Sequence, residues 1–255
     1  MNIFGAHRLL SEHVLALIAA LIVLAPVSQV QAAERRFSTG NFTSLRIDGD
    51  VDVEIVEGPS HVIVAEGENR ALSQIRVRTS SRAVTISMRA EGRTGFTSDR
   101  PQLRITVPRL NRIDYQSNGM LTAERLVGED VQVIIGRSGS ARIDAVEAKS
   151  LLINMTSSGM LEIAGDTDRH NLIVGGYGQV DAADVLSQET DLVVQGPVEV
   201  IAHAQDRIDG VISEGAEVRI FGGADCSAVQ VFNIEAVGTS LLCDADELAE
   251  MEEEV

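Results

Sequence analysis

A short phrase built around a glycine returns at nearly constant intervals through the second half of this 255-residue chain. In the phrase a serine or glycine precedes the marker glycine, and alternating apolar and polar residues follow it, as in residues 157–163. Successive marker glycines are 18 to 20 residues apart, and they are Gly119, Gly139, Gly159, Gly178, Gly196 and Gly215. A fixed period in this range is typical of a protein in which one structural unit stacks on the next.

Each repeat contains two stretches with the periodicity of a β-strand. An apolar stretch such as residues 131–135 or 151–155 precedes the glycine, and a shorter alternating piece such as residues 141–143 follows it. Alternation with period two places one set of side chains inside and the other set outside. The glycine and serine between the stretches fit a turn, because glycine reaches positive φ without steric cost and a serine hydroxyl bonds nearby backbone.

The length of the repeat decides between the β architectures that fit this pattern. A strand, a crossover helix and a return strand need roughly 30 residues, so a coil of about 19 has room only for two short strands. The sequence therefore predicts an all-β, right-handed parallel β-solenoid (β-helix) with coils of about 19 residues. The alternative, a β-sandwich with turns every ten or so residues, gives no reason for a glycine to recur in step. In the solenoid we expect Val133, Ile153, Val174 and Val194 to stack in one ladder.

Residues 37–110 also alternate as strands do, but without the regular period. Clear examples are residues 51–55, 84–88 and 103–107. We expect longer, less regular strands here that begin the sheet and form a strand-rich N-terminal cap, since a stacked array needs its open end covered. No low-complexity linker separates this part from the regular coils of residues 111–243, so the sequence predicts a single domain over residues 33–243.

The first 32 residues have the layout of a secretory signal peptide. Arg8 precedes an apolar core at residues 14–25, and Val30-Gln31-Ala32 is a small-residue cleavage signal. The alternative is an uncleaved membrane anchor, but this core is shorter than the ~20 residues that a spanning helix needs. We therefore expect cleavage after Ala32 and no membrane insertion of the mature chain. The mature protein is then exported, to the periplasm or to the cell surface or exterior of a bacterium.

The chain is strongly acidic, with a formal net charge of −17 at pH 7. This charge argues against nucleic acids and anionic membrane surfaces as partners, since both select basic patches. The acidity is densest in residues 244–255, which we expect to form a solvated tail or a short helix over the last coil.

The two cysteines, Cys226 and Cys243, are predicted to form a disulfide. In an oxidising compartment an even pair is most simply a bridge. Neighbouring coils lie about 4.8 Å apart, which falls within the Cα range of roughly 4.4–6.8 Å that a disulfide spans. The bridge would staple the last coil to the one before it. The alternative is a metal site, but two cysteines whose nearest histidine is His203 make a poor one.

The sequence offers little for catalysis or cofactor binding. The mature histidines, His61, His170 and His203, are isolated, and we expect them on the surface or in turns. Their spacing is not that of a metal site, so we predict neither a metal nor a cofactor.

One pair of carboxylates is a candidate for acid and base catalysis. The outward positions after the marker glycines are predicted to be Thr122, Arg142, Glu162, Asp181 and Glu199. Stacked on neighbouring coils, Glu162 and Asp181 would make an acid and base pair of the kind that polysaccharide-cleaving β-helices use. Alternating exposed polar residues give the same pattern without catalysis. We therefore predict no catalytic residue and no enzyme.

Three stretches of the chain together carry a family resemblance. They are residues 42–47 with 51–55, residues 103–113, and the repeated Ser-x-Gly phrases that follow. In this order the chain resembles the putative auto-transporter adhesin head, GIN domain family, a DUF2807-type domain, over residues 37–238. The resemblance implies a secreted β-solenoid with an adhesive role and brings no catalytic residues with it. The chain departs from the family pattern at Gly196-Pro197, where the Ser-x-Gly phrase is lost.

These observations favour a non-catalytic, exported cell-envelope module that recognises a protein or glycan partner through a face of the solenoid. Two alternatives stay open, a β-helix carbohydrate-active enzyme and a periplasmic structural or signalling partner protein. The sequence assigns no individual binding residue and no oligomeric state.

Overall fold

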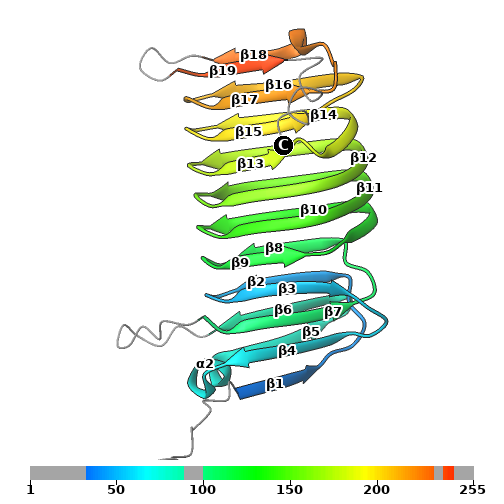
Figure 1. The fold of residues 1–255 in the computed structure, drawn as a ribbon, viewed down its shortest axis with the longest axis vertical. Helices are drawn as coiled ribbons and strands as arrows, with labels where there is room; N and C mark the ends of the chain where they lie inside the picture. The colour runs from blue at the N-terminus through cyan, green and yellow to red at the C-terminus, as the bar shows by residue number, and fades with distance from the viewer. Residues whose placement is uncertain (1–32, 89–99, 233–237, 244–255) are drawn as a thin grey trace, which may run out of the picture. The chain divides into compact units, whose positions relative to one another are not determined.

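The computed structural model describes residues 33–88, 100–232 and 238–243, and within them the chain folds as a parallel β-solenoid (Figure 1). Strands one coil apart pair side by side in parallel, as Val133 does with Ile153 and Ile153 with Leu172. This pairing confirms the predicted fold class. It excludes the β-sandwich alternative, in which neighbouring strands would run antiparallel.

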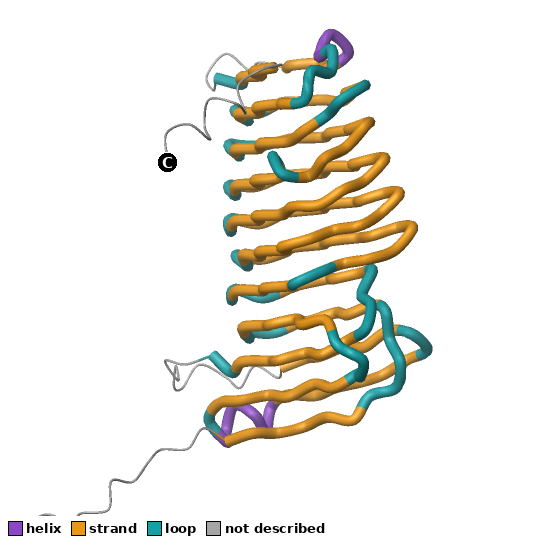
Figure 2. Tube along the Cα trace, turned by 45° about the vertical axis from the view of Figure 1, so that its right-hand side comes forward, coloured by secondary structure: helices purple, strands orange, loops and turns teal. Residues whose placement is uncertain are grey.

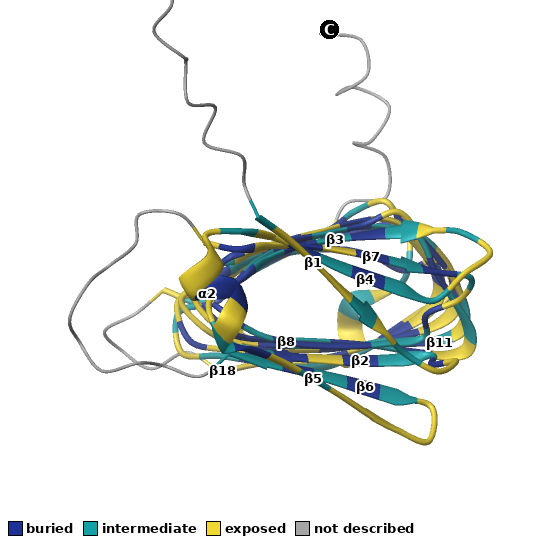
Figure 3. Ribbon diagram, turned by 90° about the horizontal axis from the view of Figure 1, so that it is seen from below, coloured by how far each residue is buried: buried dark blue, intermediate teal, exposed yellow. Residues whose placement is uncertain are grey.

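The strands lie in two layers that enclose the core (Figure 3). We call the first layer face A. Its first two strands pair antiparallel, and every later pair in this face is parallel. In spatial order face A contains β5 (Ile75–Ser80), β6 (Ala83–Met88), β2 (Ser44–Asp48), β8 (Arg112–Gln116), the second parts of β10 (Leu126–Arg137), β11 (Ser140–Ser157), β12 (Met160–Gly176) and β14 (Val185–Gln195), then β16 (Arg207–Ser213) and β18 (Val229–Phe232).

The opposite layer is face B. It uses the first parts of β11 and β12, so that a single long strand serves both faces. In spatial order face B contains β1 (Ala33–Ser38), β4 (Val62–Gly67), β7 (Gln102–Val107), β3 (Asp52–Glu57), β9 (Met120–Ala123), the first parts of β11 and β12, then β13 (Gln179–Ala182), β15 (Glu199–His203), β17 (Glu217–Phe221) and β19 (Ser240–Cys243).

The two faces meet at two different edges, which Figure 2 shows in one view. At the turn edge, short loops carrying the Ser-x-Gly phrases reverse the chain. At the bend edge, β11 and β12 run from face B to face A without a break in their pairing apart from a register shift after Ile143. The two short strands predicted for each coil are therefore present, but in these coils they join into one strand of 17 or 18 residues.

The core is built from inward rows that run along the stack. One row on face A holds Val133, Ile153, Leu172 and Leu192, and all four are at most 1% exposed. Fully burying each such side chain contributes roughly 1.5–3 kcal/mol. Val174 and Val194 belong to the next inward row, two residues further along the strand. The four residues predicted to stack in one ladder thus lie in one sheet but in two rows. The reason is that Ile153 pairs with the residue 19 positions later, Leu172, and not with Val174.

The N-terminal end of the solenoid is capped as predicted. The coil formed by β6 and β7 lies beneath that of β2 and β3, and the antiparallel strands β1, β4 and β5 border it. The helix α2 (Asn69–Gln74) buries Ala71 and Leu72 there. These strands have five or six residues and are not longer than those of the coils, because none of them continues around the bend edge.

The predicted disulfide between Cys226 and Cys243 is present, with the two Cα atoms 6.5 Å apart. Cys226 begins the 3-10 helix η2 (Cys226–Ala228), which opens the last coil. Cys243 ends β19, one turn of the solenoid later, where it pairs with Ile220 of the strand below. In the chain-entropy account, closing a loop of this length stabilises the fold by roughly 3 kcal/mol.

The predicted signal peptide (residues 1–32) and acidic tail (residues 244–255) lie outside the described residues, so both stay predictions. Among the residues that the structure describes, no helix has the length and apolar character needed to cross a bilayer.

Candidate binding surface

The recurring glycines are explained by close contact between coils at the turn edge. Ser140 N donates a hydrogen bond to Gly119 O at 3.1 Å, and Gln179 N donates to Gly159 O at 3.1 Å. A Cβ on Gly159 would lie 2.0 Å from Gly139 O. None of the first four marker glycines has a positive φ. The expectation that these positions need glycine for positive φ is therefore wrong; they need it because a carbonyl oxygen of the coil below occupies the space of a side chain.

The last two markers, Gly196 and Gly215, are not in register with the first four. Glu199 pairs with Gln179 and Glu217 pairs with Glu199, so Val198 and Ala216 occupy the positions above Gly178. Gly196 and Gly215 have φ of 96° and 84°, and they serve the turn itself. In these coils the glycine lies one or two residues earlier in the turn, because the turn has a different backbone conformation.

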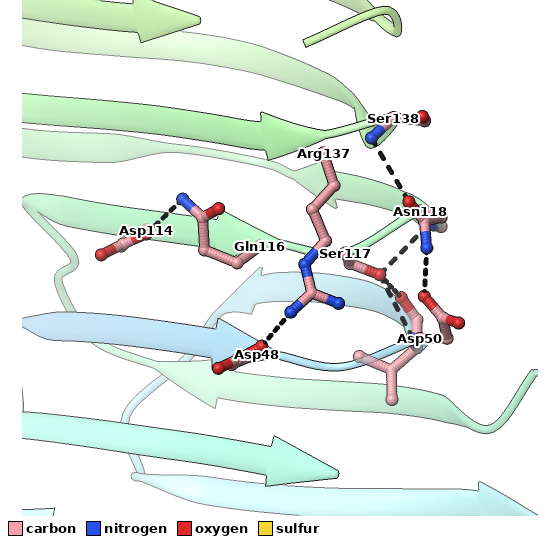
Figure 4. Close-up of polar contacts among 10 residues, drawn as sticks. Asp48, Asp50, Asp114, Gln116, Ser117, Asn118, Arg137 and Ser138 are labelled. Carbon is pink, nitrogen blue, oxygen red and sulfur yellow. Dashed lines mark hydrogen bonds and ion pairs between the residues drawn. The ribbon is translucent and has the colours of Figure 1, made fainter. Parts of the chain in front are cut away.

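The polar side chains of the turn edge bind one another from coil to coil (Figure 4). Asn118 Nδ2 donates to Asp50 Oδ1 at 2.6 Å, and Asn118 Oδ1 accepts from Ser138 N at 3.3 Å. Arg137 reaches down to an ion pair with Asp48. The recurring serine also has a structural role, since the buried Ser117 hydroxyl accepts from Gly119 N at 3.0 Å. These groups hold the coils in register, and we assign them no ligand.

The outward row of face B contains the carboxylates considered for catalysis. Thr122, Arg142, Glu162 and Asp181 do lie on successive coils, as predicted, but the fifth position is Ile201 and not Glu199.

The surroundings of these carboxylates are those of a solvated surface. Glu162 forms an ion pair with Arg142, which also binds Asp144 at 2.9 Å. The hydrogen bond to Asp144 and the charge of Glu162 raise the pKa of the Arg142 guanidinium. The Glu162 side chain is 49% exposed, and Asp181 accepts a hydrogen bond from Ala183 N at 3.2 Å. Glu162 and Asp181 thus belong to a polar ladder, with no water-excluding cleft around them in the described part of the chain.

Two of the histidines lie in the interior, which corrects the expectation that they are at the surface. His170 is completely buried in an inward row between Leu151 and Thr190, and neither of its ring nitrogens has a hydrogen-bond partner in the described structure. Burial lowers the pKa of His170 to about 4. His203 is 5% exposed, and its carbonyl accepts from Thr190 Oγ1 at 2.9 Å. The sequence carried a signal for His170, because the period of Leu172 and Val174 extends back to it.

No group of three or more metal-binding side chains comes together within residues 33–88, 100–232 and 238–243.

The outer side of face A carries a groove with a volume of about 570 Å³, which we call the face A groove. Its apolar surface is provided by Leu152, Ile173 and Val193. Ile173 is 40% exposed and Val193 is 51% exposed. Since period-two alternation normally places polar residues at such outward positions, consecutive exposed aliphatic side chains here indicate a surface that contacts something other than water.

The charge of the face A groove is negative. Among the described residues that line it are the carboxylates of Asp130, Asp191 and Asp209 and neither lysine nor arginine. Arg207 lies beside the groove and forms ion pairs with Asp209 at 2.6 Å and with Asp191 at 3.8 Å. The groove is therefore suited to a partner that combines apolar and cationic groups.

The amino-acid sequence matches a known protein family over most of its length. The sequence model of the family "Putative auto-transporter adhesin, head GIN domain" (DUF2807) matches residues 41–224. The chain belongs to this family. The matched segment of the GIN domain includes every residue of the face A groove. None of the curated proteins matches the sequence.

Solved structures support the GIN domain fold. A putative adhesin from Bacteroides fragilis NCTC 9343 has a TM-score of 0.77 at 15% identity, covering 85% of this chain and 98% of that one. A putative adhesin from Parabacteroides merdae ATCC 43184 has a TM-score of 0.63 at 15% identity, covering 85% and 97%. A putative lipid binding protein from Parabacteroides distasonis ATCC 8503 has a TM-score of 0.56 at 15% identity, covering 86% and 96%. At these identities the likeness concerns the fold alone.

Sequence reasoning missed the face A groove of this GIN domain. The signal was present in residues 172–174 and 192–194, where the outward residue between two inward ones is itself apolar. Continuous apolar runs are also typical of strands buried on both sides, so the sequence alone does not show which of these side chains reaches the surface.

Proposed function

We propose that this GIN domain is an exported, non-catalytic, adhesin-like module that binds a protein of the cell envelope on the outer side of face A. The observation that carries the proposal is the pair of exposed aliphatic residues Ile173 and Val193 on adjacent coils of one open groove. The family description, an adhesin head, and the predicted signal peptide support the same role.

A protein partner suits the groove better than a glycan does. Sugar rings are commonly held by stacking on aromatic side chains, and the described residues that line the groove include no aromatic side chain. The chain as a whole is only 3% aromatic. Aliphatic side chains flanked by carboxylates instead match the apolar centre and charged rim of a protein interface.

The carbohydrate-active alternative has weaker support. Glu162 and Asp181 are adjacent on face B, but neither lines the face A groove, and Glu162 is engaged by Arg142. Release of oligosaccharides from envelope polysaccharides, abolished by Glu162→Gln or Asp181→Asn, would establish that alternative and overturn the proposal.

Site-specific photocrosslinking tests the binding face. A benzophenone amino acid is placed at Val193 of face A or, as a matched control, at Ile201, an outward position of face B. On cells that export the protein, we expect a discrete protein adduct from position 193 and none from position 201. Equal adducts from both positions, or saturable binding to a glycan array with no protein adduct, would contradict a protein-binding face A.

A further inference from the structure

The geometry of face A restricts the shape of a partner, if the proposed function holds. Two outward columns run along the solenoid axis, side by side. Ile173, Val193 and Val211 follow one another in the first column, and Asn171, Asp191 and Asp209 follow one another in the second. Within a column, neighbours are about 4.8 Å apart, and the columns are separated by two residues along the strand, or about 6.8 Å.

The spacing within the apolar column is close to that of successive turns of an α-helix. A helix advances about 5.4 Å per turn, so across three rungs its contact residues drift by only about 1.2 Å from the column. An extended strand lying along the same column presents side chains on one side every ~6.8 Å and drifts by about 4 Å. A helix therefore contacts all three aliphatic residues in step, whereas an extended segment does not.

The charge of the second column sets the sequence of that helix. Asp191 and Asp209 lie on one flank of the aliphatic column, and Asp130 lines the same groove further down the stack. Arg207 compensates part of this charge through its ion pairs with Asp191 and Asp209. A lysine or arginine on the matching flank of the helix completes the charge balance and favours one orientation.

We propose that the face A groove binds an amphipathic α-helix of a partner protein, with apolar residues at positions i, i+3 or i+4, and i+7 and with basic residues along one flank. The mode is the helix-in-groove recognition that protein partners use widely. This inference rests on the proposed function and adds to it the class of partner segment.

A synthetic helix tests the inference directly. The probe is a fluorescein-labelled 14-residue peptide with leucine at the stated spacing and lysine on one flank. One control peptide has the same composition in an order without helical period, and a second has glutamate in place of lysine. Fluorescence anisotropy with the full mature protein should show the amphipathic probe binding at least about tenfold more tightly than either control. A tenfold difference in Kd corresponds to about 1.4 kcal/mol of binding free energy.

Variants of the protein locate the site. Ile173→Ser with Val193→Ser should weaken binding of the probe at least tenfold, and Asp191→Asn with Asp209→Asn should reduce both the affinity and its dependence on salt. Ile201→Ser on face B is the matched control and should leave binding unchanged. Circular dichroism of each variant establishes that it is folded.

Three results would overturn the inference. They are equal binding of the scrambled peptide, equal binding to the face A and face B variants, and tighter binding of the glutamate peptide. A protein adduct from position 193 in the crosslinking experiment, together with a helical probe that binds no better than its controls, would leave the proposed function standing and refute the helix.

Discussion

At the scale of single residues, the buried His170 in the interior of this solenoid is costly to ionise. His170 is fully buried, both ring nitrogens lack partners among the described residues, and its pKa is lowered to about 4 by desolvation. In the unfolded chain the same imidazole titrates near its ordinary value of about 6.5. Stability therefore depends on pH through this residue.

The sign of the dependence follows from proton uptake. Above pH 6.5 both states hold a neutral His170, and the residue contributes no pH dependence. Between pH 6.5 and about 4 only the unfolded chain binds the proton. The free energy of unfolding therefore falls by roughly 3 kcal/mol as the pH is lowered across this window. We expect His170→Leu to reduce the fall in the free energy of unfolding across this window, measured by urea titration at several pH values. A wild-type slope retained in the variant would contradict the assignment.

A second residue-scale prediction concerns the marker glycines. Gly159→Ala places a methyl group 2.0 Å from Gly139 O, so the backbone must shift, and we expect a loss of about 1–3 kcal/mol. Gly175→Ala, in the strand β12 that follows Gly159, is the matched control, because the atom nearest to its added Cβ is 3.6 Å away. Thermal melting of both variants checks the difference. Similar melting temperatures would show that the turn edge accommodates the methyl group.

At the scale of elements, the sequence predicts what is periodic and misses what depends on register. Alternation around Val133 and Ile153 predicted the strands and their inward side, and the repeat length of about 19 residues predicted their parallel stacking. It did not predict that β11 continues around the bend edge, because a bend within a continuous ladder leaves no turn residue to find. Gly196 was taken as an equivalent of Gly178, although pairing places it two residues earlier.

The candidate site was missed for a related reason. Ile173 and Val193 read as interior residues of apolar runs, and only the pairing register shows that their side chains leave the sheet on its outer side. Glu162 and Asp181 were correctly placed on adjacent coils, but the ion pair with Arg142 depends on side-chain positions that the spacing does not give.

A prediction at the element scale concerns the last coil. Strands β18 and β19 pair on one side only within the described residues, with β16 and β17, and the disulfide closes their coil. Reduction, or Cys226→Ser with Cys243→Ser, should cost roughly 3 kcal/mol of the stability of this coil. Hydrogen exchange should then accelerate in β18 and β19 before it changes in β11. Uniform acceleration over all coils would show instead that the solenoid opens as one unit.

At the scale of the whole molecule, stability comes from contacts between neighbouring coils, with one end sealed by a cap. Leu72 of α2 is 3% exposed and belongs to the common core. Leu72→Ala should cost about 2–5 kcal/mol by leaving a cavity beneath the first coil. We expect exchange protection to fall first in β6 and β7, with β14 and β16 keeping theirs. Loss of protection across every strand at once would contradict nearest-neighbour stabilisation.

The order of coils at the sealed end determines how the chain can be wound. β2 and β3 come before the strands of every other coil in the chain, yet each lies between a strand of the β6–β7 coil and a strand of the β8–β9 coil, both of which come later. A chain that emerges N-terminus first must therefore hold its initial rung unsupported until Val107 has followed. Further coils are then added on both sides of that rung, so the coils of this solenoid do not form in the order of the chain from one terminus to the other.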